Sequence, residues 1–457
     1  MTGPSETLPG PAETARWLAH HRPDLLDAYR TQLPGARTAV DARLAAAVAR
    51  ERLTADPLAG RFAGELENSV ANLALARATQ PPPDGGPPVL TREVPHGAFW
   101  EQLVVDGHPL HPGCRTRSGL TTGDVLAYGP EHRPTVDLVQ VEVPEDRWHS
   151  TGTGLPPLLH LHPWQAARLL PDHPYLRPVG TRPARPLMSL RTLAPLDDPA
   201  LHLKTAVDAQ MTSAVRTVSP AAVENGPTVT AYLAGLADGV TILREPAAGA
   251  VAGDDGRRLA VVHRQAPPAT AIPLAALCAP SPADGAPLAR EAVRLGYGGD
   301  PRPFLADLTA VVVTGPLRLL DHGVGLEAHG QNTLVTLDGG RPARLYYRDV
   351  GGIRIDPGRL RADGVTVHGD LAAATPDEPE TTLLAALTVV LHETVAALAA
   401  ATGTDPAQLW AACAKNAGAR LTGRDTLPVK ATTAMRLAAD PLVPLWTSVP
   451  NPLAAHR

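Results

Sequence analysis

Apolar residues recur at three- and four-residue spacing from residue 11 to residue 79. That is the period of a helix with one buried face, so we expect helices over 14–33, 38–53 and 62–78. The stretch PPPDGGPP at 81–88 interrupts the pattern, because Pro and Gly are strong local breakers of regular structure. A helical region therefore begins the chain.

Residues 98–265 carry short alternating or fully apolar runs between Gly and Pro turns, a pattern typical of strands. We expect strands over 101–107, 135–143, 201–210 and 239–245. The run GRRLAVVHR at 256–264 is expected to pair with 239–245 in a long hairpin. The Pro- and Ala-rich residues 267–290 predict an irregular loop.

The last part of the chain mixes both patterns. Residues 302–321 predict a helix, and two more helices are expected at about 381–400 and 405–420. Between them, NTLVTL at 332–337 and ARLYYRDV at 343–350 flank the turn sequence DGGRP, a strong hairpin signal.

This order of elements predicts an α+β fold. We divide it into a helical region at 1–88, a mainly β region at 89–290 and an α+β region at 291–457.

Composition excludes several classes of protein. A net charge of −5 over 457 residues argues against nucleic acid as a partner. The cysteines Cys114, Cys278 and Cys413 are too few and too widely spaced for a disulfide framework or a CxxC metal site. We see no secretory signal pattern and no uninterrupted apolar run of about 18 residues, so we expect no membrane partner and a cytoplasmic location.

Lysine is rare, since only Lys204, Lys415 and Lys430 occur among 41 basic residues. In a chain that otherwise uses Arg, a Lys can indicate a site that needs a compact ammonium group. The alternative is chance survival on the surface.

Histidines and arginines cluster in GHPLHPGCRTRSG at 107–119. Pro fixes the backbone after His108 and His111, and Arg115 and Arg117 could meet a polyanion such as a triphosphate. A structured turn with surface arginines explains the same residues. Zinc is a poor interpretation, because no Cys or acidic partner sits at ligand spacing.

Polar side chains also follow the expected strands. His160 and His162 alternate with leucines in LHLHPWQ and so face one side of a strand, where half-buried histidines with satisfied hydrogen bonds are the alternative interpretation.

A dense set of hydrogen-bond donors comes next, in SLRT and HLKTAVDAQMTSAVR. It consists of Ser189, Arg191, Thr192, Lys204, Thr212 and Arg216. Donors and cations this close in sequence suit a phosphate or carboxylate ligand, whereas a Lys at a solvated strand edge can simply block pairing.

EAHGQN at 327–332 is the most informative segment. Glu327, His329 and Gln331 alternate with small residues, so an extended chain would point all three to one face.

The hairpin then constrains Asp349. If its turn centres near residue 340, the numbers of paired residues sum to about 680, which places Asp349 opposite Gln331 or Asn332. A Glu, an Asn and an Asp brought together in this way can hold Mg²⁺ beside phosphates. A polar strand with a salt bridge between Asp349 and a neighbour such as Arg348 is the alternative.

Taken together, these motifs resemble the IucA/IucC family of siderophore synthetases, the NRPS-independent (NIS) synthetases. The matching pieces span about residues 98–452 in the expected order: GHPLHP…R.RSG, HPWQ, SLRT, HLK…T…R, EAHGQNTLV, YRDVGG and K…MRL…NP. The N-terminal helices match only in character.

The resemblance implies a fold likened to a cupped hand, with thumb, fingers and palm subdomains and a palm distantly similar to a protein-kinase lobe. It implies ATP- and Mg²⁺-dependent adenylation of a carboxyl group, usually of citrate, with release of pyrophosphate. An amine or hydroxyl then captures the acyl group and AMP departs. Relatives are commonly dimers, so a homodimer is expected.

By motif position, the resemblance also implies roles for individual residues. Contacts to the nucleotide and its phosphates are assigned to His162, Ser189, Arg191, Thr192, Lys204, Gln331 and Asn332. Contacts to the carboxylate substrate are assigned to Thr212, Arg216 and His329, and the metal shell to Glu327, Asn332 and Asp349. The catalytic residues would be Lys204, Arg216, His329 and Asp349.

Three features depart from the family pattern. Arg115 stands where the family usually has Lys, Gly351 stands where some relatives carry another acid, and 457 residues is short. Two alternatives therefore stay open: an ATP-dependent ligase for another carboxylic acid in a specialised-metabolite pathway, and a binding protein that has lost catalysis. A kinase is disfavoured, because the chain lacks a GxGxxG loop and an HRD-type run.

Overall fold

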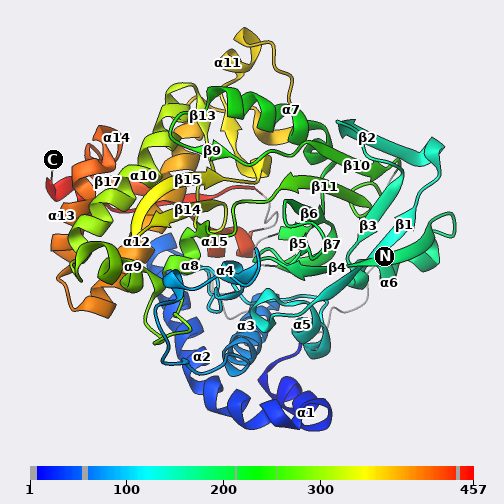
Figure 1. The fold of residues 1–457 in the computed structure, drawn as a ribbon, viewed down its shortest axis with the longest axis horizontal. Coiled ribbons are helices and arrows are strands. Elements are labelled where there is room, and N and C mark those ends of the chain that lie inside the picture. Colours follow the sequence, from blue (N-terminus) through cyan, green and yellow to red (C-terminus); the bar gives the residue numbers. More distant parts are fainter. Residues whose placement is uncertain (1–7, 54–59, 212–213, 254, 439–442, 457) are drawn as a thin grey trace.

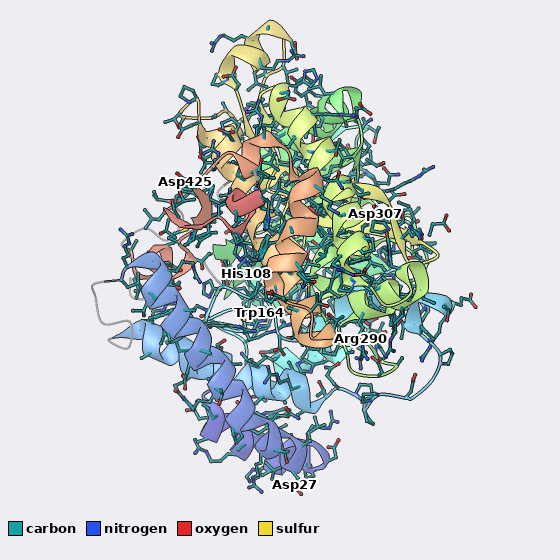
Figure 2. All side chains as sticks on the ribbon, turned by 90° about the vertical axis from the view of Figure 1, so that its left-hand side faces the viewer. Asp27, His108, Trp164, Arg290, Asp307 and Asp425 are labelled. Carbon is teal, nitrogen blue, oxygen red and sulfur yellow. The ribbon has the colours of Figure 1, made fainter. Side chains whose placement is uncertain are left out.

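The N-terminal helices form one end of the molecule in the computed structural model, which describes residues 8–53, 60–211, 214–253, 255–438 and 443–456. They are α1 (Pro11–His21), α2 (Pro23–Glu51) and α3 (Arg61–Ala78), drawn in blue at the bottom of Figure 1. In the view turned by 90°, Asp27 marks their lower tip (Figure 2). The predicted helical start of the chain is confirmed.

The expected break between the helices at 14–33 and 38–53 is wrong, because α2 continues through Pro34 as one helix. Proline removes one hydrogen bond from a helix interior. Here Tyr29 before it and Ala36 and Val40 after it are all buried in one hydrophobic cluster shared with α3. The burial of these side chains on both sides of Pro34 outweighs the cost of the lost backbone hydrogen bond.

The middle of the chain builds an eight-stranded sheet, ordered β2-β10-β11-β6-β5-β4-β1-β3, in which every pairing is antiparallel. Its strands are β1 (Val136–Glu142), β2 (Trp148–Gly152), β3 (Leu158–Leu161), β4 (Arg177–Pro186), β5 (Thr192–Pro195), β6 (Leu201–Thr205), β10 (Ala247–Val251) and β11 (Ala260–Gln265). A short ladder of β7 (Val207–Met211) and β8 (Ala214–Arg216) follows β6.

Two strand predictions in this region are wrong. Residues 101–107 contain the end of the short helix α4 (Phe99–Gln102) and a loop. The expected hairpin of 239–245 with 256–264 does not form, because β11 pairs with β10 and β6 instead. An alternating pattern can indicate a strand but does not identify its partner, because strand pairing depends on tertiary neighbours.

The C-terminal region is built around a four-stranded sheet, ordered β12-β14-β15-β9. Its strands are β9 (Thr241–Ile242), β12 (Ile272–Pro273), β14 (Thr333–Asp338) and β15 (Arg341–Tyr347). The predicted hairpin is confirmed, and its first four pairs, from Thr333↔Tyr347 to Thr336↔Arg344, each sum to 680. Strand β9 joins β15 in parallel and brings a middle segment of the chain into this sheet.

Helices pack around this second sheet. The three helices predicted near 302–321, 381–400 and 405–420 are confirmed. The helices from the middle of the chain onward are α5 (Thr122–Tyr128), α6 (Pro163–Leu169), α7 (Pro220–Leu236), α8 (Leu274–Leu277), α9 (Leu288–Tyr297), α10 (Pro301–Asp321), α11 (Pro357–Ala362), α12 (Glu378–Thr402), α13 (Pro406–Ala417), α14 (Ala419–Thr422) and α15 (Thr432–Leu437). Two small ladders complete the fold: β13 (Val324–Gly325) with β16 (Arg354–Ile355), and β17 (Thr426–Lys430) with β18 (Trp446–Pro450).

Helices α10 and α12 are long and apolar enough to span a membrane by length and composition alone. In this fold they pack against each other, and α10 also packs against α13 and β15. Both contribute many side chains to the largest hydrophobic core. Burial of this kind is typical of the core helices of soluble proteins.

Candidate active site

A polar cavity of about 330 Å³ is lined by both the large sheet and the C-terminal hairpin region. Among the described residues it is lined by five cations and three carboxylates: Arg191, Lys204, Arg216, Arg354, Lys430, Glu327, Asp349 and Asp370. Ser189, His329, Gln331 and Asn332 line it as well. The two segments singled out in the sequence, near 189–216 and near 327–349, therefore meet in one place.

The sheet side of the cavity is shaped by the SLRT segment. Thr192 on β5 pairs with Lys204 on β6, and its hydroxyl accepts a hydrogen bond from Ser189 Oγ at 2.9 Å. Leu190, between Ser189 and Arg191 in the sequence, has its backbone in the left-handed region, at φ 66°, and its side chain is buried. This sharp turn places Ser189 and Arg191 beside Lys204 at the cavity, while Thr192 supports them from outside its lining.

Arg191 has an unused donor that suits an anionic ligand. Its Nε atom is buried and has no hydrogen-bond partner among the described residues, although another nitrogen donates to Thr217 O. Burial lowers the pKa of Arg191 to about 10, which still leaves the guanidinium charged at neutral pH. A phosphate oxygen would satisfy such a donor.

Asp349 lies at the open end of the hairpin and faces the sheet. Its Oδ1 accepts a hydrogen bond from Lys204 Nζ at 2.9 Å, and its Oδ2 lies 3.4 Å from Arg264 Nη2. Burial opposes ionisation, but the charges of Lys204 and Arg264 hold the pKa of Asp349 well below its usual value. Its backbone has φ 71°, an unusual conformation for a residue with a side chain.

The EAHGQN segment is not the extended strand that we expected, because backbone hydrogen bonds from Asn332 and Thr333 to His329 O bend it into a turn. Glu327, His329 and Gln331 still face the same cavity. The turn, rather than strand alternation, brings them together.

Glu327 is held by Lys430, whose Nζ donates to its Oε1 at 3.1 Å. Burial raises the pKa of Glu327, but the charges of Lys430 and His329 outweigh burial and leave it below its usual value. Gly352 makes room for the carboxylate, since a Cβ there would lie 2.0 Å from Glu327 Oε2.

His329 lines the cavity and contacts neighbouring residues through both ring nitrogens. Its Nδ1 accepts from the backbone N–H of Gln331 at 3.2 Å, and its Nε2 lies 3.3 Å from Asn332 Nδ2. Burial lowers the pKa of the ring, which favours the uncharged imidazole.

Three segments are tied together behind the cavity by a buried ion pair. Arg348 Nη1 donates to Glu101 Oε1 at 2.6 Å, and Arg348 Nη2 donates to Gln331 O at 2.9 Å. Glu101 also accepts from the Met188 N–H at 2.9 Å. This network fixes α4, the loop before Ser189 and the open end of the hairpin relative to one another.

Oxygen ligands of the kind that Mg²⁺ prefers are present in Glu327, Asn332 and Asp349. Among the residues the structure describes, no three His, Cys, Asp or Glu side chains are grouped closely enough to hold a metal. Both carboxylates are already paired with lysines. The residues therefore fit a magnesium ion that arrives with phosphate groups, because phosphates would draw the lysines away and supply the missing oxygens.

One expected site residue, His162, lies outside the cavity lining. His162 is fully buried, accepts a hydrogen bond from the Trp164 N–H and packs against Tyr128, and it does not line the cavity. Thr212 lies outside the described residues.

The arginines of the GHPLHPGCRTRSG motif have a structural role that neither of our interpretations foresaw. Arg115 and Arg117 are buried and lie 3.1 and 3.7 Å from Glu131 Oε1, and Arg115 also donates to Val105 O. Burial opposes their effect on Glu131, yet the two arginines lower the pKa of this carboxyl to about 2. They compensate an internal charge and are neither on the surface nor open to a ligand.

Arg264 and Glu245 are functional candidates that the sequence did not reveal. Arg264 on β11 donates to Glu245 Oε1 at 2.6 and 2.8 Å and faces Asp349. Both residues are nearly fully buried. The signal in the sequence is an Arg at the end of the apolar run LAVVHR, because a charge on a buried strand is rare unless it is paired.

Comparison with family models matches two parts of the chain. The model of the IucA / IucC family matches residues 96–154 and 157–279. A model described as ferric iron reductase FhuF-like transporter matches residues 303–455. That second part contains a single cysteine, Cys413, whereas iron–sulfur clusters need several thiolates.

Curated relatives include siderophore enzymes at low sequence identity. Staphyloferrin A synthase of Staphylococcus aureus is 28% identical over 315 residues, which is 56% of this chain and 53% of the relative. D-ornithine–citrate ligase of the same strain is 25% identical over 378 residues, covering 66% and 57%. The alignments thus span about half the length of these relatives.

Solved structures share the fold over most of the chain. ATP-bound aerobactin synthetase IucA of Klebsiella pneumoniae matches with a TM-score of 0.72 and 19% identity over 92% of this chain and 86% of that one. Petrobactin biosynthesis protein AsbB of Bacillus anthracis matches with a TM-score of 0.70 and 20% identity over 86% and 78%. The α+β architecture expected from the sequence is confirmed.

Proposed function

The chain belongs to the IucA/IucC family, and on that premise we propose that it is an ATP- and Mg²⁺-dependent synthetase. It adenylates a carboxyl group of citrate or a related polycarboxylic acid and condenses it with an amine or hydroxyl in siderophore biosynthesis. The names of the relatives support this substrate class, since they include a citrate ligase and a citryl-spermidine ligase. A cytoplasmic homodimer with thumb, fingers and a kinase-like palm belongs to the same proposal.

The observation that carries the proposal is the meeting of cations and carboxylates in one cavity. A carboxylate and a triphosphate repel each other, so a site that joins them must supply positive charge in fixed positions. In this proposal Arg191 and Lys204, which line the cavity, hold phosphate oxygens. Arg216 and His329, which line it as well, orient the carboxylate of the acid.

Mg²⁺ would be held by Glu327, Asn332 and Asp349 together with phosphate oxygens, and it would supply further charge neutralisation there. The residues of the chain do the rest by positioning, which can contribute several kcal/mol in a reaction between two bound groups. No nucleophilic side chain is needed, because the carboxylate of the substrate is itself the attacking group.

The proposal is tested by acid-dependent exchange of labelled pyrophosphate into ATP, with a panel of citrate and other carboxylic acids. We expect exchange that requires both Mg²⁺ and a polycarboxylic acid. Exchange with a different acid alone would select the alternative ligase. Release of ADP would indicate a kinase, and the absence of any nucleotide turnover would leave the non-catalytic binding protein.

A further inference from the structure

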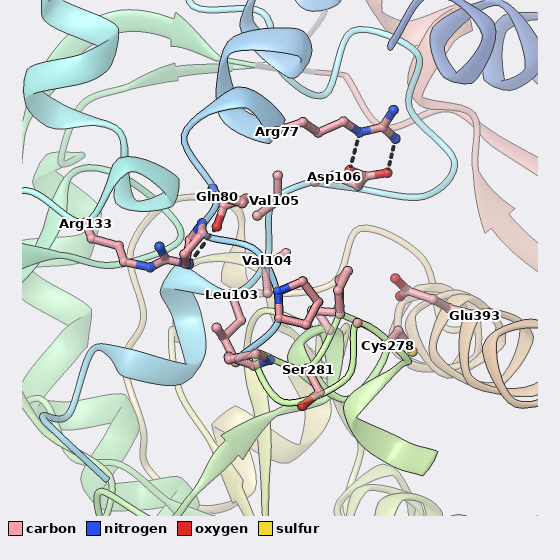
Figure 3. A pocket seen from close by; sticks show the side chains of 18 residues that line it. Arg77, Gln80, Leu103, Val104, Val105, Asp106, Arg133, Cys278, Ser281 and Glu393 are labelled. Atoms are coloured by element: carbon pink, nitrogen blue, oxygen red, sulfur yellow. Dashed lines mark hydrogen bonds and ion pairs between the residues drawn. The ribbon is translucent and has the colours of Figure 1, made fainter. Parts of the chain in front are cut away.

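A second cavity, of about 530 Å³, is lined mainly by apolar side chains (Figure 3). They include Leu103, Val104, Val105, Ala279, Pro280 and Pro282. We call it the Glu393 cavity, after the carboxylate that α12 contributes to its wall.

Glu393 is the unexpected residue in this wall. Helix α12 is otherwise apolar enough to span a membrane by its length and composition. No hydrogen bond or ion pair to the Glu393 carboxylate is found in the described part of the chain, and Figure 3 shows it directed toward the cavity. Burial raises the pKa of this carboxyl to about 7, although the positive charge of Arg43 acts in the opposite direction. A half-buried carboxylate without a partner is costly and is usually retained for a ligand.

The other charged side chains around the cavity have hydrogen-bond partners. Arg77 donates to Asp106 at 2.9 Å, whereas Arg133 donates to the neutral amide of Gln80 at 2.6 Å and keeps its positive charge (Figure 3). Glu393 is the carboxylate of this lining for which no hydrogen bond or ion pair is found among the described residues, and the wall also presents the methyl groups of Val104, Val105 and Ala279. A carboxylate beside methyl groups complements a cation with an aliphatic body.

The Glu393 cavity shares a wall with the candidate active site. Ala275, which lines it, donates its backbone N–H to Gly330 O at 3.1 Å. Gly330 lies between His329 and Gln331, which both line the first cavity. The approach is so close that a Cβ on Gly330 would lie 2.9 Å from Ala275 N. One layer of backbone thus separates the two cavities at this point.

We propose that the Glu393 cavity binds a small aliphatic amine, whose ammonium group pairs with the Glu393 carboxylate while its methylene chain lies against Val104, Val105 and Ala279. Binding of the amine does not depend on the proposed function.

Calorimetric titration of the full chain, without ATP or acid, tests the binding site. The probes are butylamine, 1,4-diaminobutane and butan-1-ol, which share an apolar body but differ in charge. We expect the amines to bind and the alcohol not to bind. Glu393→Gln should weaken amine binding roughly tenfold or more, the effect of losing a charged hydrogen-bond partner. Glu393→Asp keeps the charge, so its affinity for the amines should lie between those of the wild type and Glu393→Gln.

The matched control is Glu145→Gln, an exposed carboxylate outside this cavity, which should bind the amines as the wild type does. Equal amine binding by the wild type and Glu393→Gln would overturn the proposal, and so would an alcohol that binds as tightly as the amines. The comparison of amine with alcohol uses the wild type alone, so it decides the matter even if Glu393→Gln does not fold.

A wild type that exchanges no pyrophosphate with any acid would remove the proposed function, while calorimetry would still decide whether the cavity binds amines.

Discussion

At the scale of single residues, backbone strain marks the candidate site. Among the described residues, four non-glycine positions have positive φ: Arg52, Arg133, Leu190 and Asp349. Arg52 and Arg133 end helical segments, where such a conformation is common. Asp349 instead lines the polar cavity, and Leu190 lies between Ser189 and Arg191, which line it too, so surrounding contacts must hold both residues in place.

Asp349→Asn should abolish most of the turnover while the protein still folds. The amide cannot pair with Lys204 and Arg264 as the carboxylate does, so the cations lose their fixed positions. We expect a loss of roughly a hundredfold or more in kcat/KM, the scale typical of removing one group from a preorganised polar site. The measurement is pyrophosphate release at saturating ATP.

The matched control for this variant is Asp338→Asn, an exposed residue at the turn end of the same hairpin. It should keep wild-type activity. An Asp349→Asn protein as active as Asp338→Asn would remove Asp349 from the site.

Glu393 should make stability depend on pH. Its pKa is about 7 in the folded protein and about 4 in an unfolded chain. The folded state therefore binds more protons than the unfolded state within this window, and stability falls as pH rises through it. Glu393→Gln should gain stability relative to the wild type between about pH 5 and about pH 8. Urea unfolding at several pH values measures this gain. A difference in the free energy of unfolding between Glu393→Gln and the wild type that does not change with pH would contradict it.

Rare residue types were the best sequence signal at this scale. Two of the three lysines, Lys204 and Lys430, line the candidate site, whereas Lys415 is exposed on α13. Arg264 escaped notice because arginine is common in this chain and its partner Glu245 comes from another segment. Composition can reveal a rare residue type such as lysine, but it cannot reveal that a residue of a common type is buried.

At the scale of elements, local pairing was predictable and distant pairing was not. The β14–β15 hairpin has the predicted register because a tight turn fixes which residues face each other. Strand β9 instead pairs with β15, about one hundred residues later, and no turn signals that contact. The same limit explains the wrong hairpin in the middle of the chain.

The ion pair of Arg348 and Glu101 should be essential for the arrangement of these elements. Both side chains are buried, at 4% and 3% exposure, so removal of one leaves a buried charge without a partner. We expect Glu101→Gln to reduce the free energy of unfolding by about 3–5 kcal/mol. Denaturant unfolding measures the loss.

The exposed pair of Arg302 and Asp300 provides the comparison. Asp300 also caps the N-terminus of α10, so Arg302→Gln is the cleaner variant, and it should leave the free energy of unfolding nearly unchanged. A Glu101→Gln protein as stable as Arg302→Gln would show that the buried pair does not hold these segments.

At the scale of the whole molecule, the two ends of the chain are joined beside the site. Glu51 at the end of α2 accepts hydrogen bonds from the backbone N–H groups of Thr433 and Ala434 in α15. Glu65 on α3 forms a buried ion pair with Arg436. Because α15 begins two residues after Lys430, the N-terminal helices help to place the lysine that holds Glu327.

The central claim is that this assembly lets a carboxylate oxygen attack the α-phosphate of ATP. Citrate labelled with ¹⁸O in its carboxyl groups tests it directly, in a reaction with ATP, Mg²⁺ and an amine. One labelled oxygen should move to AMP as the amide forms, with pyrophosphate as the other product. Label in inorganic phosphate together with ADP would mean attack on the γ-phosphate, and it would contradict the account.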